Sequence, residues 1–180
     1  MRHLLLLAII VAFLAIILVV RRLKSDTATT ISLNAVKHPV AFLTIAIGVS
    51  ISLSLVAIYY VSWLRPEYGL NFPSTILFFS IILSFIITSW VPDSSGWKRR
   101  LHRGGAYAAI LIMPLFLLSV LTVAVPGVIA TITVLALFAL LFMLYLFFFV
   151  PKARQWFLLF QGLYLTVFFA VLILLTYGVS

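Results

Sequence analysis

Six long apolar segments, none containing an Asp, Glu, Lys, Arg or His residue, occupy most of the 180-residue chain. A helix needs about 20 predominantly apolar residues to cross the roughly 30 Å of hydrocarbon in a bilayer. Each segment is therefore predicted to be a transmembrane helix, and the fold is expected to be all-α, one six-helix domain over residues 1–180. The predicted spans are residues 4–20, 39–64, 73–91, 105–125, 128–150 and 157–177.

The charge content excludes a soluble fold. Hydrophobic residues make up 66% of the chain and charged residues 8%, against about 45–50% and about 25% in soluble domains. The net charge of +9 does not indicate nucleic acid as a partner, because a nucleic-acid binder carries its basic face on a soluble body. Cysteine is absent, which excludes disulfides and thiolate chemistry.

The positions of the basic residues predict an orientation. Ten of the 12 Lys and Arg residues lie near the first, third and fifth loops, whereas only Arg2 and Arg65 lie on the opposite side. Cytoplasmic loops are enriched in Lys and Arg. The chain is therefore predicted to be a multi-pass plasma-membrane protein with both termini on the outer side of the membrane. The first segment is expected to be retained, because Arg21-Arg22 stands where a signal peptide needs small residues for cleavage.

Tyrosine and tryptophan residues stand near the predicted ends of the spans, where aromatic side chains gather at the two bilayer interfaces. Tyr59, Tyr60 and Trp63 are expected in the outer belt, and Trp90, Trp97 and Trp156 in the cytoplasmic one.

The acidic residues do not mark a catalytic centre. Asp26, Glu67 and Asp93 are the three acids of the chain, and all lie outside the predicted spans. Ion-coupled carriers and intramembrane proteases keep ionisable or nucleophilic groups within the hydrocarbon region, and zinc sites need converging His, Cys or carboxylate ligands. No catalytic residue and no metal site is predicted.

The predicted third loop, residues 91–105, is the strongest local constellation. Asp93 and His102 stand nine residues apart and bracket a tryptophan and several cations. One interpretation is a carboxylate–imidazole pair at the cytoplasmic surface, flanked by cations that hold lipid phosphate. The other is a turn closed by Asp93, with cations that only set the orientation. The predicted contacts to anionic lipid or to a partner are Asp93, Trp97, Lys98, Arg99, Arg100, His102 and Arg103.

Two histidines raise the hypothesis of a haem cofactor. His38 and His102 are each expected at the start of a helix on the cytoplasmic side. Two imidazoles from different helices are what a b-type haem requires, and the run from Trp97 to Arg103 resembles the W-x-x-L-H-R run of ferric-reductase-like haem membrane proteins. Haem b is therefore the alternative to a chain without a cofactor.

Small and hydroxyl residues recur every four positions in two of the predicted spans. A spacing of four places each set on one stripe, where small residues let helices approach closely and hydroxyls bond across the interface. A polar translocation path is the alternative use. The two stripes are Thr44, Gly48 and Ser52, and Ser80, Ser84 and Thr88.

The order of features in the middle of the chain points to a family. The third span ends in Trp90-Val91-Pro92-Asp93, and His102 with Gly105-Ala106 opens the fourth. In these features the chain resembles the bacterial branch of the Frag/DRAM-like membrane superfamily, a domain of unknown function, although Asp93 follows Pro92 directly where the usual member has one residue between them. The resemblance implies a six-helix membrane fold and little chemistry.

The sequence thus favours a non-enzymatic membrane protein, a scaffold or accessory subunit that packs with lipids or with other membrane subunits. A small transporter or lipid-handling protein that uses Asp93 and His102 is the first alternative. A haem-carrying redox subunit is the second.

Overall fold

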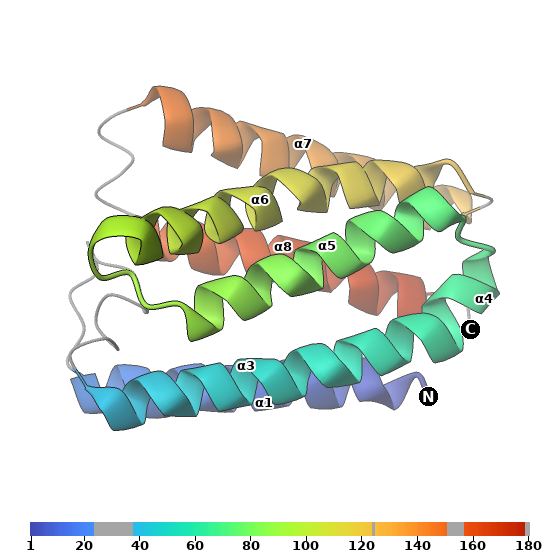
Figure 1. Cartoon of the computed structure of the whole chain (residues 1–180). Coiled ribbons are helices and arrows are strands. Elements are labelled where there is room, and N and C mark those ends of the chain that lie inside the picture. The colour runs from blue at the N-terminus through green and yellow to red at the C-terminus, as the bar shows by residue number, and fades with distance from the viewer. Residues whose placement is uncertain (24–37, 124, 151–156, 179–180) are drawn as a thin grey trace.

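The chain is all-helical in the part that the computed structural model describes, residues 1–23, 38–123, 125–150 and 157–178, where no strand occurs (Figure 1). The helices, in chain order, are α1 (His3–Leu23), α3 (Pro39–Tyr59), the π-helix η1 (Tyr60–Leu64), α4 (Arg65–Tyr68), α5 (Phe72–Trp90), α6 (Gly96–Leu121), α7 (Gly127–Phe149) and α8 (Phe157–Tyr177). The predicted all-α class is confirmed.

Four continuous helices within the described ranges are long and apolar enough to cross a membrane. They are Pro39–Tyr68, which joins α3, η1 and α4, and the single helices α5, α6 and α7. The apolar stretches described in α1 and α8, His3–Val19 and Gly162–Tyr177, are shorter. By length and composition, the chain is a helical membrane protein.

The second predicted span continues past its expected end at Leu64. The helix changes to π-type hydrogen bonding at Tyr60–Leu64, where the N–H of Arg65 donates to the carbonyl of Tyr60, and it resumes as α4. Pro66 follows this π-turn directly. Proline has no N–H and its ring crowds the carbonyl four residues earlier, so a local widening of the helix just before it is physically reasonable. The helix ends at Gly69, whose φ of 61° suits a residue without a Cβ.

Helix α6 begins at Gly96, nine residues before the predicted start of the fourth span at Gly105. The expected loop is therefore mostly two turns of helix. The prediction was wrong here because it took the start of the apolar run as the start of the helix, whereas Lys and Arg are good helix formers that extend it toward the N-terminus. In these turns His102 and Gly105 face inward and the basic residues face outward.

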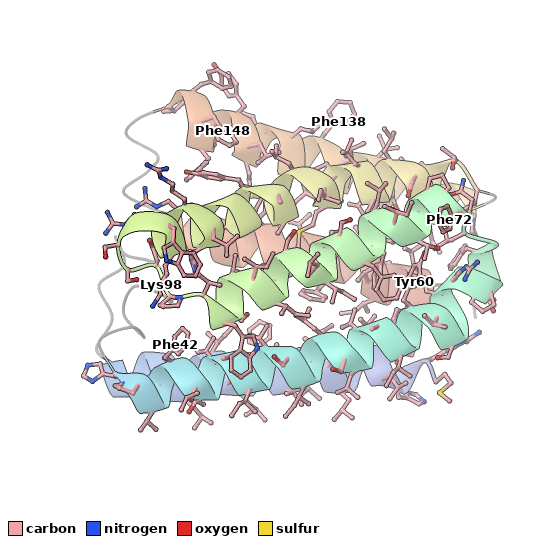
Figure 2. All side chains as sticks on the ribbon, in the orientation of Figure 1. Phe42, Tyr60, Phe72, Lys98, Phe138 and Phe148 are labelled. Atoms are coloured by element: carbon pink, nitrogen blue, oxygen red, sulfur yellow. The ribbon has the colours of Figure 1, made fainter. Side chains whose placement is uncertain are left out.

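The helices form two antiparallel hairpins to which α7 and α8 are added. In Figure 1, α1 lies along α3 on one side of the bundle, α5 pairs with α6, α8 runs behind them, and α7 occupies the far edge. An aromatic ladder joins four helices through the middle: Tyr60 stacks on Phe78 with ring centroids 3.9 Å apart, Phe78 lies 5.4 Å from Phe116, and Phe116 lies 6.2 Å from Phe168. Tyr60, labelled in Figure 2, starts this ladder.

Two glycines set the closest helix contacts. A Cβ at Gly48 would collide with the Cβ of Ala15, which brings α3 directly against α1. A Cβ at Gly105 would lie 3.1 Å from the carbonyl oxygen of Ser84 and 3.2 Å from the methyl group of Thr88, which brings α6 against α5. Gly48, Ser84 and Thr88 of the two stripes are therefore at packed interfaces, and Gly105 is a packing residue that the stripes did not include.

The hydroxyl groups of the stripes bond differently from the prediction. Instead of reaching across an interface, Thr44 donates to the carbonyl of Val40 and Ser84 to that of Ser80, each four residues earlier in its own helix. Thr88 donates to the carbonyl of Phe85, three residues earlier. The nearest acceptor for a helical hydroxyl is a carbonyl of the preceding turn, so the small size of these residues, more than their polarity, serves the packing. Ser52 is also buried.

Candidate functional site

The turn between α5 and α6 carries most of the predicted site residues. Helix α5 ends at Trp90, and Val91 takes an extended conformation. Pro92 cannot donate a backbone hydrogen bond, and its own carbonyl accepts from the N–H of Ser94 at 2.8 Å. Gly96, with a φ of 60°, then turns the chain into α6. Proline and glycine thus fix a short connection that places Asp93 against the first turns of α6.

Asp93 is the buried centre of this turn. Its side chain is 5% exposed and its Oδ1 lies 3.5 Å from Nε of Arg99 and 3.8 Å from Nε of Arg103. The two arginines stand four residues apart on α6 and therefore share one face of the helix. Their side chains are about half exposed, 51% and 53%. One carboxylate thus holds two guanidinium groups beside the turn while both remain open to the surroundings.

His102 fastens the same turn from the other side. Its ring is buried, and Nδ1 donates to the carbonyl oxygen of Val91 at 2.7 Å. A carbonyl only accepts, so Nδ1 must carry a proton in this arrangement. The contacts of Asp93 and His102 described here are thus to Arg99, Arg103 and Val91, and they clamp the first turns of α6 onto the end of α5.

The remaining cations make this end of the helix strongly positive. Lys98 and Arg100 are exposed, and Figure 2 shows Lys98 at the edge of the turn. Between residues 91 and 105 the four basic residues and Asp93 sum to +4 − 1 = +3. The N-terminus of a helix already carries a partial positive charge, and α6 has no acidic residue in its first turn and no side-chain cap from Ser95. The site therefore attracts anions.

The two tryptophans beside the turn have different surroundings. Trp97 is 67% exposed, as expected for an interfacial side chain. Trp90 donates from Nε1 to the hydroxyl of Ser50 at 2.9 Å, a contact that links the end of α5 to α3. This partner could not be predicted from the stripes, because Ser50 lies outside the four-residue stripe of its helix.

The haem hypothesis concerns two histidines in unlike settings. His38 is exposed and precedes α3 at its N-cap, whereas His102 is buried in the α5–α6 turn. A hydrogen bond from Nδ1 to a backbone carbonyl, as His102 makes, is also found in metal-ligating histidines. Haem binding stays a prediction that an absorption spectrum tests. Among the described residues, no group of three His, Cys, Asp or Glu side chains is placed to hold a metal ion.

A second cluster of polar contacts, which the sequence did not reveal, lies at the opposite end of the bundle. The hydroxyl of Tyr59 lies 2.6 Å from that of Thr176 in α8, and the hydroxyl of Tyr60 lies 3.0 Å from that of Thr75 in α5. Tyr68 donates to the carbonyl of Leu175 at 2.6 Å. Tyr59 and Tyr60 are fully buried, so their prediction as members of an interfacial belt was wrong. Buried tyrosines seek a partner for the hydroxyl, and the threonines provide it.

No protein-family model, curated protein or solved structure matches the chain. The resemblance to the Frag/DRAM-like superfamily therefore stays a prediction, and the function is argued from the geometry alone.

Proposed function

We propose that the chain is a non-enzymatic plasma-membrane protein of six spans, with both termini outside, that serves as a scaffold or accessory subunit and is held at the cytoplasmic surface by anionic lipids around the α5–α6 turn. In this proposal α1 and α8 complete the six spans. The cation-rich ends of α1 and α6 face the cytoplasm, in agreement with the positive-inside rule.

The observation that carries the proposal is the pairing of buried Asp93 with two arginines. Its carboxylate pairs with Arg99 and Arg103 and is itself buried, an arrangement that organises cations and fastens a turn. Half-exposed guanidinium groups are suited to phosphate, which they bind through paired N–H donors. At the membrane surface the phosphates of anionic lipids are the nearest such ligands.

The outer surface of the bundle supports a packing role. Helix α7 buries few side chains and exposes a broad aromatic and aliphatic face, from which Phe138 projects away from the other helices (Figure 2). Such a face suits lipid tails or the transmembrane helix of another subunit. The most exposed large apolar residues of α7 are Val128, Leu135, Phe138, Phe142, Tyr145 and Phe149.

The proposal is tested in the native membrane. Chemical cross-linking followed by affinity purification and mass spectrometry is expected to yield a membrane subunit in fixed ratio to the chain, together with anionic lipids. Replacement of Phe138 and Phe142 by Ala should reduce the cross-linked subunit, and replacement of Lys98 and Arg100 by Gln should reduce the lipids. A protein that runs as a monomer and brings down neither subunit nor anionic lipid contradicts the proposal.

One observation favours a second candidate, a lipid-handling protein. The Oδ1 atom of Asp93 is buried and has the ion-pair contacts to Arg99 and Arg103 but no hydrogen bond, and a buried polar atom without a hydrogen bond in a native structure calls for an explanation. A transient partner, such as the amine or hydroxyl of a headgroup, would satisfy it. In vesicles that contain fluorescent phosphatidylethanolamine, this candidate predicts protein-dependent movement of the lipid between leaflets. The movement should be lost in Asp93→Ala and His102→Ala variants that still insert; movement that survives both changes contradicts it.

A further inference from the structure

Helix α6 contains a buried proline, Pro114, inside its apolar part. Proline has no N–H, so it cannot donate to the carbonyl oxygen of Ile110, four residues earlier, and its ring crowds that carbonyl. The helix therefore lacks one of its own hydrogen bonds at this level, and sharp bends in helices occur mostly at such places. In the core of a bilayer there is no water to replace the bond.

A tyrosine of α8 supplies the missing donor. The hydroxyl of Tyr164 donates to the carbonyl oxygen of Ile110, and Tyr164 is only 5% exposed. Among the carbonyls of α6, the hydroxyl thus reaches the one that Pro114 leaves without its donor from the same helix. The bond does more than join two helices, because it satisfies α6 at the turn where the helix is weakest.

Helix α8 also contacts α6 beyond the proline. The ring centroid of Phe168 lies 6.2 Å from that of Phe116, and both side chains are buried. Tyr164 and Phe168 stand four residues apart and share one face of α8. Ile110 precedes the proline and Phe116 follows it. One face of α8 therefore holds both halves of α6, by a hydrogen bond before the proline and by a ring contact after it.

The half of α6 before the proline is fastened to α5. A Cβ at Gly105 would lie 3.1 Å from the carbonyl oxygen of Ser84, and His102 bonds to the carbonyl of Val91. These contacts hold the first turns of α6 on α5, so the two would move together. A bend at the proline would therefore displace α5 and the first half of α6 relative to α8, and the hydroxyl of Tyr164 opposes this displacement.

We propose that Pro114 is a hinge in α6 and that Tyr164 is the latch that holds it. While the hydroxyl bonds to Ile110, the two halves of α6 keep one relative position. Without the bond, the half before the proline tilts against α8 together with α5. Arg99 and Arg103 lie on this half, so a displacement of α8 reaches the α5–α6 turn through the hinge. The inference requires neither the proposed orientation nor the lipid contacts.

A double-mutant cycle in the full chain tests the latch. Tyr164→Phe leaves the carbonyl of Ile110 without a donor, whereas in Pro114→Ala the new N–H at position 114 donates to that carbonyl. We expect Tyr164→Phe to lower the midpoint of thermal unfolding, and to lower it less in the Pro114→Ala background. An equal or larger loss in that background, or no loss in the native one, would overturn the inference.

Tyr107→Phe is the matched control for this cycle. Tyr107 is an exposed tyrosine on α6 itself, and the substitution removes the same hydroxyl group. Its effect on the unfolding midpoint should be the same with Pro or Ala at position 114. If it depended on residue 114 as strongly as Tyr164→Phe does, the dependence would reflect a general change in α6, and the latch would be refuted.

The hinge itself is tested by pulsed EPR distances in nanodiscs. The chain has no Cys, so spin labels can be attached to pairs of cysteines introduced at exposed positions. The test pair joins Leu101→Cys, before the proline, to Thr166→Cys on α8. The reference pair joins Leu118→Cys, after the proline, to the same position on α8.

We expect Tyr164→Phe to broaden or shift the distance distribution of the test pair. The reference pair should stay unchanged, because Phe168 still holds the second half of α6. Addition of Pro114→Ala should return the test pair to a narrow distribution, since a continuous helix has no hinge. An unchanged test pair, equal broadening of both pairs, or broadening that persists with Pro114→Ala would each contradict the inference.

Discussion

The hydroxyl oxygens of Tyr59 and Thr176 lie 2.6 Å apart, although the two residues are 117 positions apart in the chain. Both side chains are buried, and Thr176 also donates to the carbonyl of Leu172, so Tyr59 is the donor to Thr176. This contact ties α3 to α8. With the neighbouring bonds of Tyr60 and Tyr68, it anchors the α1–α3 hairpin at one end of the bundle.

Replacement of Tyr59 by Phe should therefore lower stability. Hydrogen bonds between transmembrane helices contribute on average about 0.6 kcal/mol and at most about 1.7 kcal/mol, and Phe keeps the ring packing. We expect a loss in this range in thermal unfolding of the detergent-solubilised protein. Tyr145→Phe is the control, because Tyr145 is exposed on α7. Equal stability of the two variants would show that the bond to Thr176 contributes nothing.

The contact of Gly48 with Ala15 predicts a rescue. Gly48→Ala places two methyl groups in one space, and overpacking of this kind costs about 1–3 kcal/mol. The double variant Gly48→Ala with Ala15→Gly removes the collision, so most of the lost stability should return. Unfolding of the four proteins of this cycle measures the coupling between the two sites.

Gly162 is the control for the Gly48 cycle, because a Cβ there would meet nothing within 4 Å. Alanine is the better helix former, by about 1 kcal/mol, so Gly162→Ala should keep or raise stability. If Gly48→Ala behaved like Gly162→Ala, the close α1–α3 contact would be refuted.

The adjacent residues Gly104 and Gly105 predict opposite effects of one substitution. A Cβ at Gly105 would press on the backbone of α5 at Ser84, whereas one at Gly104 would meet nothing within 4 Å. Gly105→Ala should thus destabilise the α5–α6 hairpin by about 1 kcal/mol or more, and Gly104→Ala should be neutral or stabilising. The same unfolding assay checks both, and equal effects would place α6 in another rotation about its axis.

Removal of the carboxylate at position 93 should weaken the α5–α6 turn. In Asp93→Asn, Arg99 and Arg103 lose their shared partner and the turn gains a net positive charge. We expect a loss of about 1 kcal/mol that becomes smaller at high salt, since salt screens charges near the surface. Glu67→Gln, at an exposed acid on α4, is the control and should change stability by less than about 0.5 kcal/mol. A loss that is equal in both variants would contradict the central role of Asp93.

The sequence predicted the helices better than their ends. Length and hydropathy located the apolar part of each helix, because these properties decide membrane insertion. They did not locate the start of α6 at Gly96 or the extension through η1 to Tyr68. Backbone hydrogen bonding continues through charged residues and past Pro66, where the hydropathy signal stops.

The candidate site was only partly predictable for a similar reason. The spacing of Asp93, His102 and the cations marked the α5–α6 turn, but it could not assign the partners. On a helix that begins at Gly96, Arg99 and Arg103 share one face, and Asp93 pairs with them. The hydrogen bonds of Tyr59 and Trp90 depend on contacts between segments that are far apart in the chain. Such contacts cannot be predicted from a single sequence.

The most direct test of the proposed orientation is to determine on which side of the membrane each of two turns lies. The chain has no Cys, so single cysteines can be introduced at the exposed residues Glu67, near the α4–α5 turn, and Ser95, at the start of α6. A membrane-impermeant maleimide applied to intact cells should label Glu67→Cys and not Ser95→Cys, and permeabilised cells should label both. Labelling of Ser95→Cys in intact cells would place the Arg99–Arg103 cations outside and contradict the proposed orientation and its cytoplasmic lipid contacts.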